Sequence, residues 1–432
     1  MNVPPKTAFR RSLWGIVALG ALVFALLIPP NLHGAVDIGH MTTGDEHVTY
    51  PYVLHMLEAS KDFSQFWWRT IIYGDYHYGY PFYFTSMVVL LPQRLILGDA
   101  FFDQTPLNLL VLRQLIGVLP LLLSAGLLVY LQTRFRSVWQ SAALFLFILA
   151  VPAVMRQNIQ WWHPDALSIL AVVLTLFFLD RDRLRFGRNF WFASVACGLA
   201  TAIKLQGPFF VLTIAGYLLA GRLQRRVSSW RMVALGAGFT AGMIAVTLLS
   251  NPFLFYPTQL EKMVAIQTQK QQEMSVGYSD RGEDPNLYRK EPEYWRWTLE
   301  TWYGSVPLLI GLAVALAMAC LGGKNRFANL LILGWVLPYS LYLLYGVAPK
   351  PDHYWLPVML TLFSAAFTPL EWLSGRLAGG SFRNPRLAWA ARAGSLLLAA
   401  ILCAWLAANL AQDIQLYRDG LIVDQVRYNL PD

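Results

Sequence analysis

The feature that most constrains this chain is a series of apolar segments, each close to 20 residues long, which recurs from one end of the sequence to the other. About 20 apolar residues in a helix cross a hydrocarbon core roughly 30 Å thick. The chain is 56% hydrophobic and 14% charged, whereas a soluble domain carries about 25% charged residues. We therefore expect an all-α polytopic membrane protein rather than a row of soluble domains.

Eleven membrane spans are predicted from the apolar runs and their flanking charges. They cover residues 12–30, 107–131, 138–154, 164–180, 190–205, 208–221, 232–250, 303–321, 327–346, 354–372 and 393–411. Residues 1–432 then form a single transmembrane domain. Two long loops, 31–106 and 251–302, and a tail over 412–432 lie on one side of the membrane.

The first loop is rich in aromatic residues, which indicates helices that lie in the membrane interface. Residues 82–98 are apolar enough to be mistaken for another span. Counting them as one would place every later basic connection on the wrong side, so we assign them to an interfacial or re-entrant helix. The second loop mixes amphipathic and polar stretches and either covers a cavity or caps the bundle.

The net charge of +9 is an orientation signal. Lys and Arg concentrate in the alternate connections, at Lys6, Arg10, Arg11, Arg134, Arg136, Arg181, Arg183, Arg185, Arg188, Arg222, Arg225, Arg226, Arg231, Lys324, Arg326, Arg376, Arg383, Arg386 and Arg392. The positive-inside rule assigns this face to the cytoplasm and the long loops to the exterior. No cluster has the aromatic interleaving of a nucleic-acid surface, so a nucleic-acid partner is not expected.

Two groups of acids precede or open helices on the outer side. In Thr43-Gly44-Asp45-Glu46-His47, a carboxylate could act as a general base, while the plain alternative is a turn and helix cap. In Gln160-Trp161-Trp162-His163-Pro164-Asp165, Asp165 could face the same cavity as Asp45, or could only complement a helix dipole. His163 and Asp165 indicate a metal only weakly, because no third ligand stands out at a recognisable spacing.

Cations form the other two groups. Lys204 lies at the outer end of the fifth span and either snorkels to the interface or binds an anionic head group. Arg113, in the second span, poses the same choice and could equally pair with an acid. Lys350-Pro351-Asp352-His353-Tyr354 places phosphate and sugar donors beside aromatic rings, although an interfacial anchor explains it as well.

The order of these features along the chain resembles the GT-C superfamily of membrane glycosyltransferases, in particular bacterial relatives of protein O-mannosyltransferases and of the lipid A aminoarabinose transferase. The resemblance covers roughly residues 12–360. It implies that Asp45 carries the catalytic role, that Asp165 is the second acid and that Lys204 is the lysine of the fifth helix. Tyr80-Pro81 resembles the aromatic-Pro segment of the family, without the Lys that some members place before that Pro.

The resemblance implies transfer of a sugar from a polyprenyl-phosphate donor to an extracytoplasmic glycan, lipid or protein acceptor, by an inverting displacement. Asp45, Glu46 and Asp165 are the predicted catalytic residues. Donor-phosphate binding is assigned to Lys204, Lys350, His353 and Arg156, and substrate binding to His163, Tyr80 and Tyr354. No protein metal ligand is assigned, although dependence on a divalent cation stays open. The expected location is the bacterial inner membrane, with the site facing outward.

Two alternatives remain open. A transporter or flippase of lipid-linked sugars would also bind polyprenyl phosphate, but its coupling charges usually lie near the midplane. A glycan polymerase or ligase that uses lipid-linked oligosaccharides is not distinguished by composition.

Overall fold

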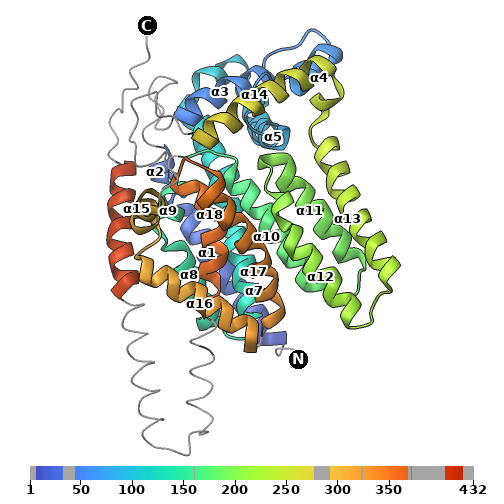
Figure 1. The fold of residues 1–432 in the computed structure, drawn as a ribbon. Coiled ribbons are helices and arrows are strands. Elements are labelled where there is room, and N and C mark those ends of the chain that lie inside the picture. Colours follow the sequence, from blue (N-terminus) through green and yellow to red (C-terminus); the bar gives the residue numbers. More distant parts are fainter. Residues whose placement is uncertain are drawn as a thin grey trace, which may run out of the picture.

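The computed structural model describes residues 6–32, 44–159, 161–276, 292–322, 325–367, 371 and 404–421. These residues form helices and connecting segments, with no strand among them (Figure 1). The predicted all-α class is confirmed. His33, His40, Cys403 and most of the predicted span 393–411 lie outside the described residues.

The first half of the chain contains α1 (Lys6–Leu26), α2 (Ile28–Leu32), α3 (Gly44–Met56), α4 (Phe63–Ile71), α5 (Tyr80–Leu97), α6 (Thr105–Leu112), α7 (Leu119–Thr133), α8 (Val138–Leu149), α9 (Pro152–Asn158), α10 (Asp165–Asp182) and α11 (Arg188–Lys204). The second half contains α12 (Val211–Leu223), α13 (Ser229–Leu249), α14 (Pro257–Val276), α15 (Pro292–Trp302), α16 (Val306–Gly322), α17 (Arg326–Leu341) and α18 (Asp352–Ser364). A further helix covers 404–421. Short 3-10 or π segments connect several of these, among them η3 (Arg113–Val118), η4 (Gly207–Phe210) and η8 (Tyr342–Gly346).

Five of the described helices are long and apolar enough to cross a membrane, and the number rises to seven if each of two bent pairs is one span. The count of eleven spans is therefore not confirmed. Four predicted spans, at 164–180, 190–205, 208–221 and 354–372, correspond to α10, α11, α12 and α18, which fall outside these five helices and two bent pairs.

The helix predicted over 82–98 is found as α5, and with its 3-10 extension it reaches from Tyr80 to Asp103. By length and composition it belongs to the five helices that could span a membrane. In Figure 1, however, α5 is viewed nearly along its axis while α10 to α13 run from the upper to the lower part of the view. It therefore lies across the direction of the bundle, as an interfacial or re-entrant helix would.

The bundle packs closely where a glycine lets two helices approach. A Cβ at Gly198 of α11 would lie 2.7 Å from Cβ of Val246 and 2.8 Å from the carbonyl oxygen of Met243 in α13. Close backbone approach through small residues is the usual basis of helix association in membranes. This contact holds α11, which carries Lys204, against α13.

The first loop separates its aromatic residues into two sets. Tyr73, Tyr76 and Tyr83 are buried with Phe253 in a second apolar core, apart from the main bundle core. Phe63 and its neighbours on α4, Trp67 and Trp68, are instead exposed. The exposed set on α4 is available for the predicted interfacial role, whereas the buried set builds the core that supports α3 and α5.

Candidate active site

The two adjacent acids of α3 have different surroundings. Glu46 is fully buried, and its carboxylate accepts hydrogen bonds from Arg113 Nε at 2.9 Å and Nη2 at 2.6 Å. It also accepts the backbone N–H of Trp162 at 2.6 Å. The Asp45 side chain is 46% exposed. Glu46 therefore joins α3 to η3 and to the residue beside His163, and Asp45 is the acid of this pair that reaches open space.

The His163-Pro164-Asp165 motif brings the second acid close to the first. Pro164 precedes α10 as its N-cap residue, and Asp165 is fully buried in the first turn. Nδ1 of His163 lies 2.7 Å from Oδ2 of Asp165, and Nε2 lies 3.6 Å from Oδ2 of Asp45. The buried imidazole thus lies between the two carboxylates that the sequence predicts to share a cavity.

Lys204 completes this group from the last residue of α11. Its ammonium contacts Oδ1 of Asp165 and lies 5.0 Å from the centroid of the Tyr354 ring. The end of α11 is placed by Gly79, which donates its N–H to the carbonyl of Ile203 at 3.1 Å. A Cβ at Gly79 would lie 1.6 Å from the carbonyl oxygen of Ala202, so no larger residue fits there.

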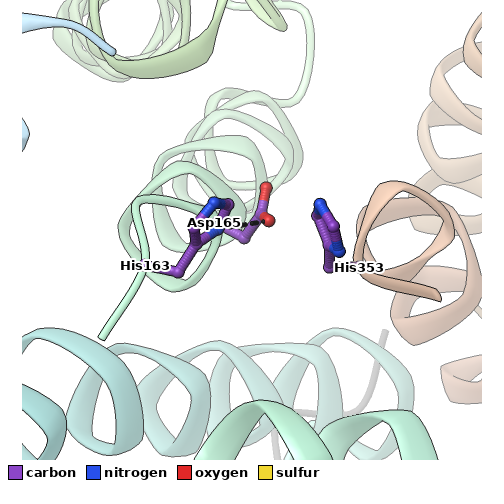
Figure 2. A group of neighbouring side chains, drawn as sticks. All are labelled: His163, Asp165 and His353. Atoms are coloured by element: carbon purple, nitrogen blue, oxygen red, sulfur yellow. Dashed lines mark ion pairs between the residues drawn. The ribbon is translucent and has the colours of Figure 1, made fainter. Parts of the chain in front are cut away.

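The start of α18 forms the opposite wall. The ring of His353 lies 5.2 Å from that of His163 and 4.9 Å from that of Trp161, centroid to centroid. Figure 2 shows His163 and Asp165 at the start of α10 and His353 on the facing helix, with Asp165 between the two imidazoles. Nη1 of Arg156 pairs with Asp352 at 3.2 Å, one residue before His353.

Two predicted site residues lie apart from this group. The ammonium of Lys350 is buried and donates to the carbonyls of Leu343 and Leu344 in η8 and of Val347 just after it. Tyr80 donates its backbone N–H to Asn251 and stacks on Phe84. Lys350 therefore caps a helix end, and Tyr80 belongs to the aromatic core of the first loop.

Tyr78 is a site residue that the sequence reasoning missed. Its hydroxyl lies 2.9 Å from Nε2 of His163. Burial, aided by the carboxylates of Asp45 and Asp165, raises the pKa of the Tyr78 hydroxyl well above its ordinary value. The hydroxyl therefore stays protonated and forms a hydrogen bond with the imidazole. Its neighbourhood, Tyr76 to Tyr80, is so rich in tyrosine that the sequence does not distinguish it.

Lys270 is the second missed residue, and it reaches the site from the other long loop. Its ammonium lies 4.7 Å from the centroid of the Tyr78 ring and donates to the carbonyl of His77 at 3.2 Å. Burial and the nearby Lys204 charge lower the pKa of Lys270 to about 8. Gln267, one turn earlier, donates to the carbonyl of Tyr76 at 2.7 Å. Helix α14 thus covers the first loop beside the site.

Three of these residues could hold a metal ion. One ligand atom from each of His163, Asp165 and His353 lies within 4.8 Å of the others. His163 Nδ1, Asp165 Oδ2 and His353 Nδ1 are buried, and each lacks a partner with hydrogen-bond geometry, despite the short His163 to Asp165 distance. Two imidazoles and a carboxylate suit Zn²⁺ or a related divalent ion. His353 would supply the third ligand, which the sequence spacing did not reveal.

The arrangement combines a proton acceptor with an anion-binding position. The half-exposed carboxylate of Asp45 lies beside buried His163 and Asp165, while Lys204 and Lys270 bring cations to the same place from two helices. Such a site can remove a proton from an attacking group and stabilise negative charge on a leaving group.

No family model matches the chain, and no curated protein matches it. Its structure is similar to that of the Archaeoglobus fulgidus oligosaccharyltransferase in the apo form, with a TM-score of 0.56 at 15% identity over 97% of this chain and 58% of that chain. It is also similar to AglB from the same organism in complex with an inhibitory peptide and a dolichol-phosphate, with a TM-score of 0.51 at 15% identity over 94% and 56% of the two chains.

The structure of ArnT from Cupriavidus metallidurans bound to undecaprenyl phosphate gives a TM-score of 0.49 at 15% identity over 94% of this chain and 72% of that chain. The chain spans a little over half of the length of the oligosaccharyltransferase. At these identities the likeness shows the fold alone.

Proposed function

We propose that the chain, whose fold is similar to that of an oligosaccharyltransferase and whose sequence resembles the GT-C superfamily, is an integral membrane glycosyltransferase that uses a polyprenyl-phosphate sugar as donor. The observation that carries the proposal is the convergence of Asp45, Asp165 and Lys204, from α3, α10 and α11, around one buried histidine. AglB, which shares the fold, was solved with a dolichol-phosphate. That ligand supports a lipid phosphate as the donor's leaving group here.

The proposed reaction is one in-line displacement at the anomeric carbon of the sugar. The acceptor oxygen or nitrogen forms the new glycosidic bond and gives its proton to the Asp45 carboxylate. The bond from the anomeric carbon to the phosphate oxygen breaks, and its electron pair leaves with the polyprenyl phosphate. The configuration at the anomeric carbon is inverted. Asp45 is suited to the base role because its side chain is 46% exposed and can reach an acceptor.

The cations act on the leaving group. Lys204 and Lys270 neutralise the charge that develops on the phosphate, a contribution of about 10²–10³ in rate for one well-placed donor. Arg156 and His353 line the side of the site formed by α18. His163 and Asp165 hold Lys204 and Tyr78 in position. The proposal takes no step through a metal ion.

We place the site on the extracytoplasmic side of a bacterial inner membrane. In Figure 1, the N-terminal end of α1 and the α12–α13 turn lie at the lower end of the bundle, and α3, α4 and α14 lie at the upper end. The lower end carries basic connections, which the positive-inside rule assigns to the cytoplasm. The charged site residues gather towards one end rather than near the middle of the spans, which favours transfer over transport.

The test is an Asp45→Asn variant in cells that lack the native chain. Lipid-linked and acceptor glycans are compared by mass spectrometry among deletion cells, cells with the native chain and cells with the variant. Loss of a general base is expected to lower transfer by about 10²–10⁴-fold. Asp99→Asn is the control, because this exposed carboxylate of the same loop pairs only with a partly exposed Arg94 among the described residues. Near-normal transfer by Asp45→Asn would remove Asp45 from the base role.

A further inference from the structure

The turn between α12 and α13 lies at the opposite end of the bundle from α3 and α14 (Figure 1). Its side chains form a basic hollow. It has a volume of about 640 Å³ and is lined by four arginines, together with the hydroxyl groups of Ser228 and Ser229. The arginines are Arg222, Arg225, Arg226 and Arg231. We call these residues the arginine turn.

The backbone fixes the shape of the arginine turn. Arg225 has a left-handed φ of 57°, and Arg226 donates its N–H to the carbonyl of Gly221 at 2.9 Å. Val227, within the turn, is buried in the bundle core and anchors the turn to the bundle. Nε of Arg222 donates to Oγ of Ser229 at 2.9 Å, across the turn. The arginines therefore project from a defined loop.

The arginine turn differs in its ion pairing from Arg134 and Arg183, which lie in two other basic connections. Arg134 and Arg183 both pair with Asp180, at 2.5 and 3.2 Å. Within the described part of the chain, no carboxylate pairs with any arginine of the arginine turn. Four like charges in one hollow repel one another, and a bound anion would relieve that repulsion. The N-terminus of α13, which points into the turn, adds partial positive charge.

Apolar side chains flank the arginine turn. Leu223 and Trp230 are 73% and 80% exposed, and Leu219 and Val233 continue the exposed apolar surface along α12 and α13. Tryptophan is typical of the membrane interface, and apolar surface next to it faces lipid chains. A ligand for this place needs an anionic head group and an apolar body. A free anion would meet only the first requirement.

We propose that the arginine turn binds the head group of an acidic phospholipid, with the phosphate in the hollow and the acyl chains along α12 and α13. Basic hollows between membrane helices on the cytoplasmic side suit such head groups, and each Lys or Arg near the surface strengthens binding. This site is separate from the proposed transfer reaction. It is retained or lost independently of Asp45.

The test compares two variants that remove equal charge from the same face. Arg222→Gln/Arg225→Gln/Arg226→Gln removes three of the four positive charges of the arginine turn. Arg181→Gln/Arg185→Gln/Arg188→Gln is the matched control, because it removes three exposed arginines at the α10–α11 connection. Each full-length protein is reconstituted in bilayers of phosphatidylcholine with phosphatidylglycerol, and retained lipids are identified by native mass spectrometry. Labelling from each side checks that both variants insert in the native orientation.

The native chain and the control are expected to retain phosphatidylglycerol in preference to phosphatidylcholine. The variant of the arginine turn is expected to retain at least about tenfold less phosphatidylglycerol than the native chain. Equal retention by that variant would show that these arginines do not hold the lipid, and equal loss in the control would show that only the net charge of this face matters. Either result would overturn the site. Inorganic phosphate is added in a separate arm. Release of the lipid by phosphate at modest concentration would identify a free-anion site and overturn the lipid assignment.

Discussion

Replacement of Glu46 by Gln is expected to destabilise the protein rather than to remove a catalytic group. The Glu46 and Arg113 side chains are both 0% exposed, and their pairing distance is 2.6 Å. Removing one member of a buried ion pair leaves the other charge uncompensated, which costs about 3–5 kcal/mol. The amide of Gln can still accept the N–H of Trp162, so the loss falls on the contact with Arg113.

The measurement is thermal unfolding of the detergent-solubilised protein, followed by tryptophan fluorescence, for Glu46→Gln, Arg113→Met and the double variant. The double variant removes both charges, so its destabilisation is expected to be smaller than the sum of the two single effects. Glu58→Gln is the control, because the Glu58 side chain is 49% exposed and its ion pairs with His55 and Arg69 are worth under about 1 kcal/mol.

A Glu46→Gln protein that unfolds like the native chain, yet transfers no sugar, would refute this reasoning. It would show that Glu46 acts in the reaction and that its pairing with Arg113 contributes little. A Glu46→Gln protein that is destabilised and regains transfer when Arg113 is also replaced would support a structural role.

Three further predictions concern other parts of the site. Because burial lowers the pKa of Lys270 to about 8, its ammonium is charged below that pH and neutral above it, so donor binding measured against pH is expected to weaken as pH rises through about 8. Lys270→Arg stays charged, so its donor binding should not weaken as pH rises through about 8. The same weakening in that variant would exclude Lys270 as the cause. Zn²⁺ at a hundredfold excess over Kd is expected to raise the free energy of unfolding of the native chain by about 2.7 kcal/mol, because the ion binds only the folded state. The melting temperature of the native chain should rise accordingly, and that of His353→Ala should not. An equal rise in both would place the ion elsewhere. Gly79→Ala is expected to lower folded yield sharply, because its Cβ would meet the carbonyl oxygen of Ala202 at 1.6 Å, while Gly216→Ala, where a Cβ meets nothing within 4 Å, should be tolerated.

The sequence predicted the class of fold and the gathering of several site residues at one end of it. Asp45, Asp165 and His353 each follow or open a helix on the predicted outer side, so their side chains converge once the helices are placed side by side. The order of the helices and the side on which each begins are therefore enough to predict much of the site. The number of spans was less predictable, because helices such as α10 and α18 carry charges or are short and depend on neighbours for burial.

Contacts between distant segments could not be predicted from local pattern. Lys350 lies two residues before Asp352 in the sequence, but its ammonium donates to carbonyls in and just after η8. Lys270 lies in a polar, glutamine-rich stretch with no local sign of a site, and meets Tyr78 only because α14 folds over the first loop. The path of the backbone determines the contacts of Lys350, and a partner far along the chain determines those of Lys270.

The contrast between Asp45 and Glu46 follows from helix geometry. Successive residues of an α-helix point about 100° apart, so two adjacent acids in the first turn of α3 cannot both face the same opening. Glu46 faces Arg113 and the bundle, and this contact sets the rotation of α3 about its axis. That rotation in turn directs Asp45 towards His163. The two acids therefore cannot exchange roles: in the double variant Asp45→Glu with Glu46→Gln, the acid at position 45 is longer and the ion pair with Arg113 that directs it is lost.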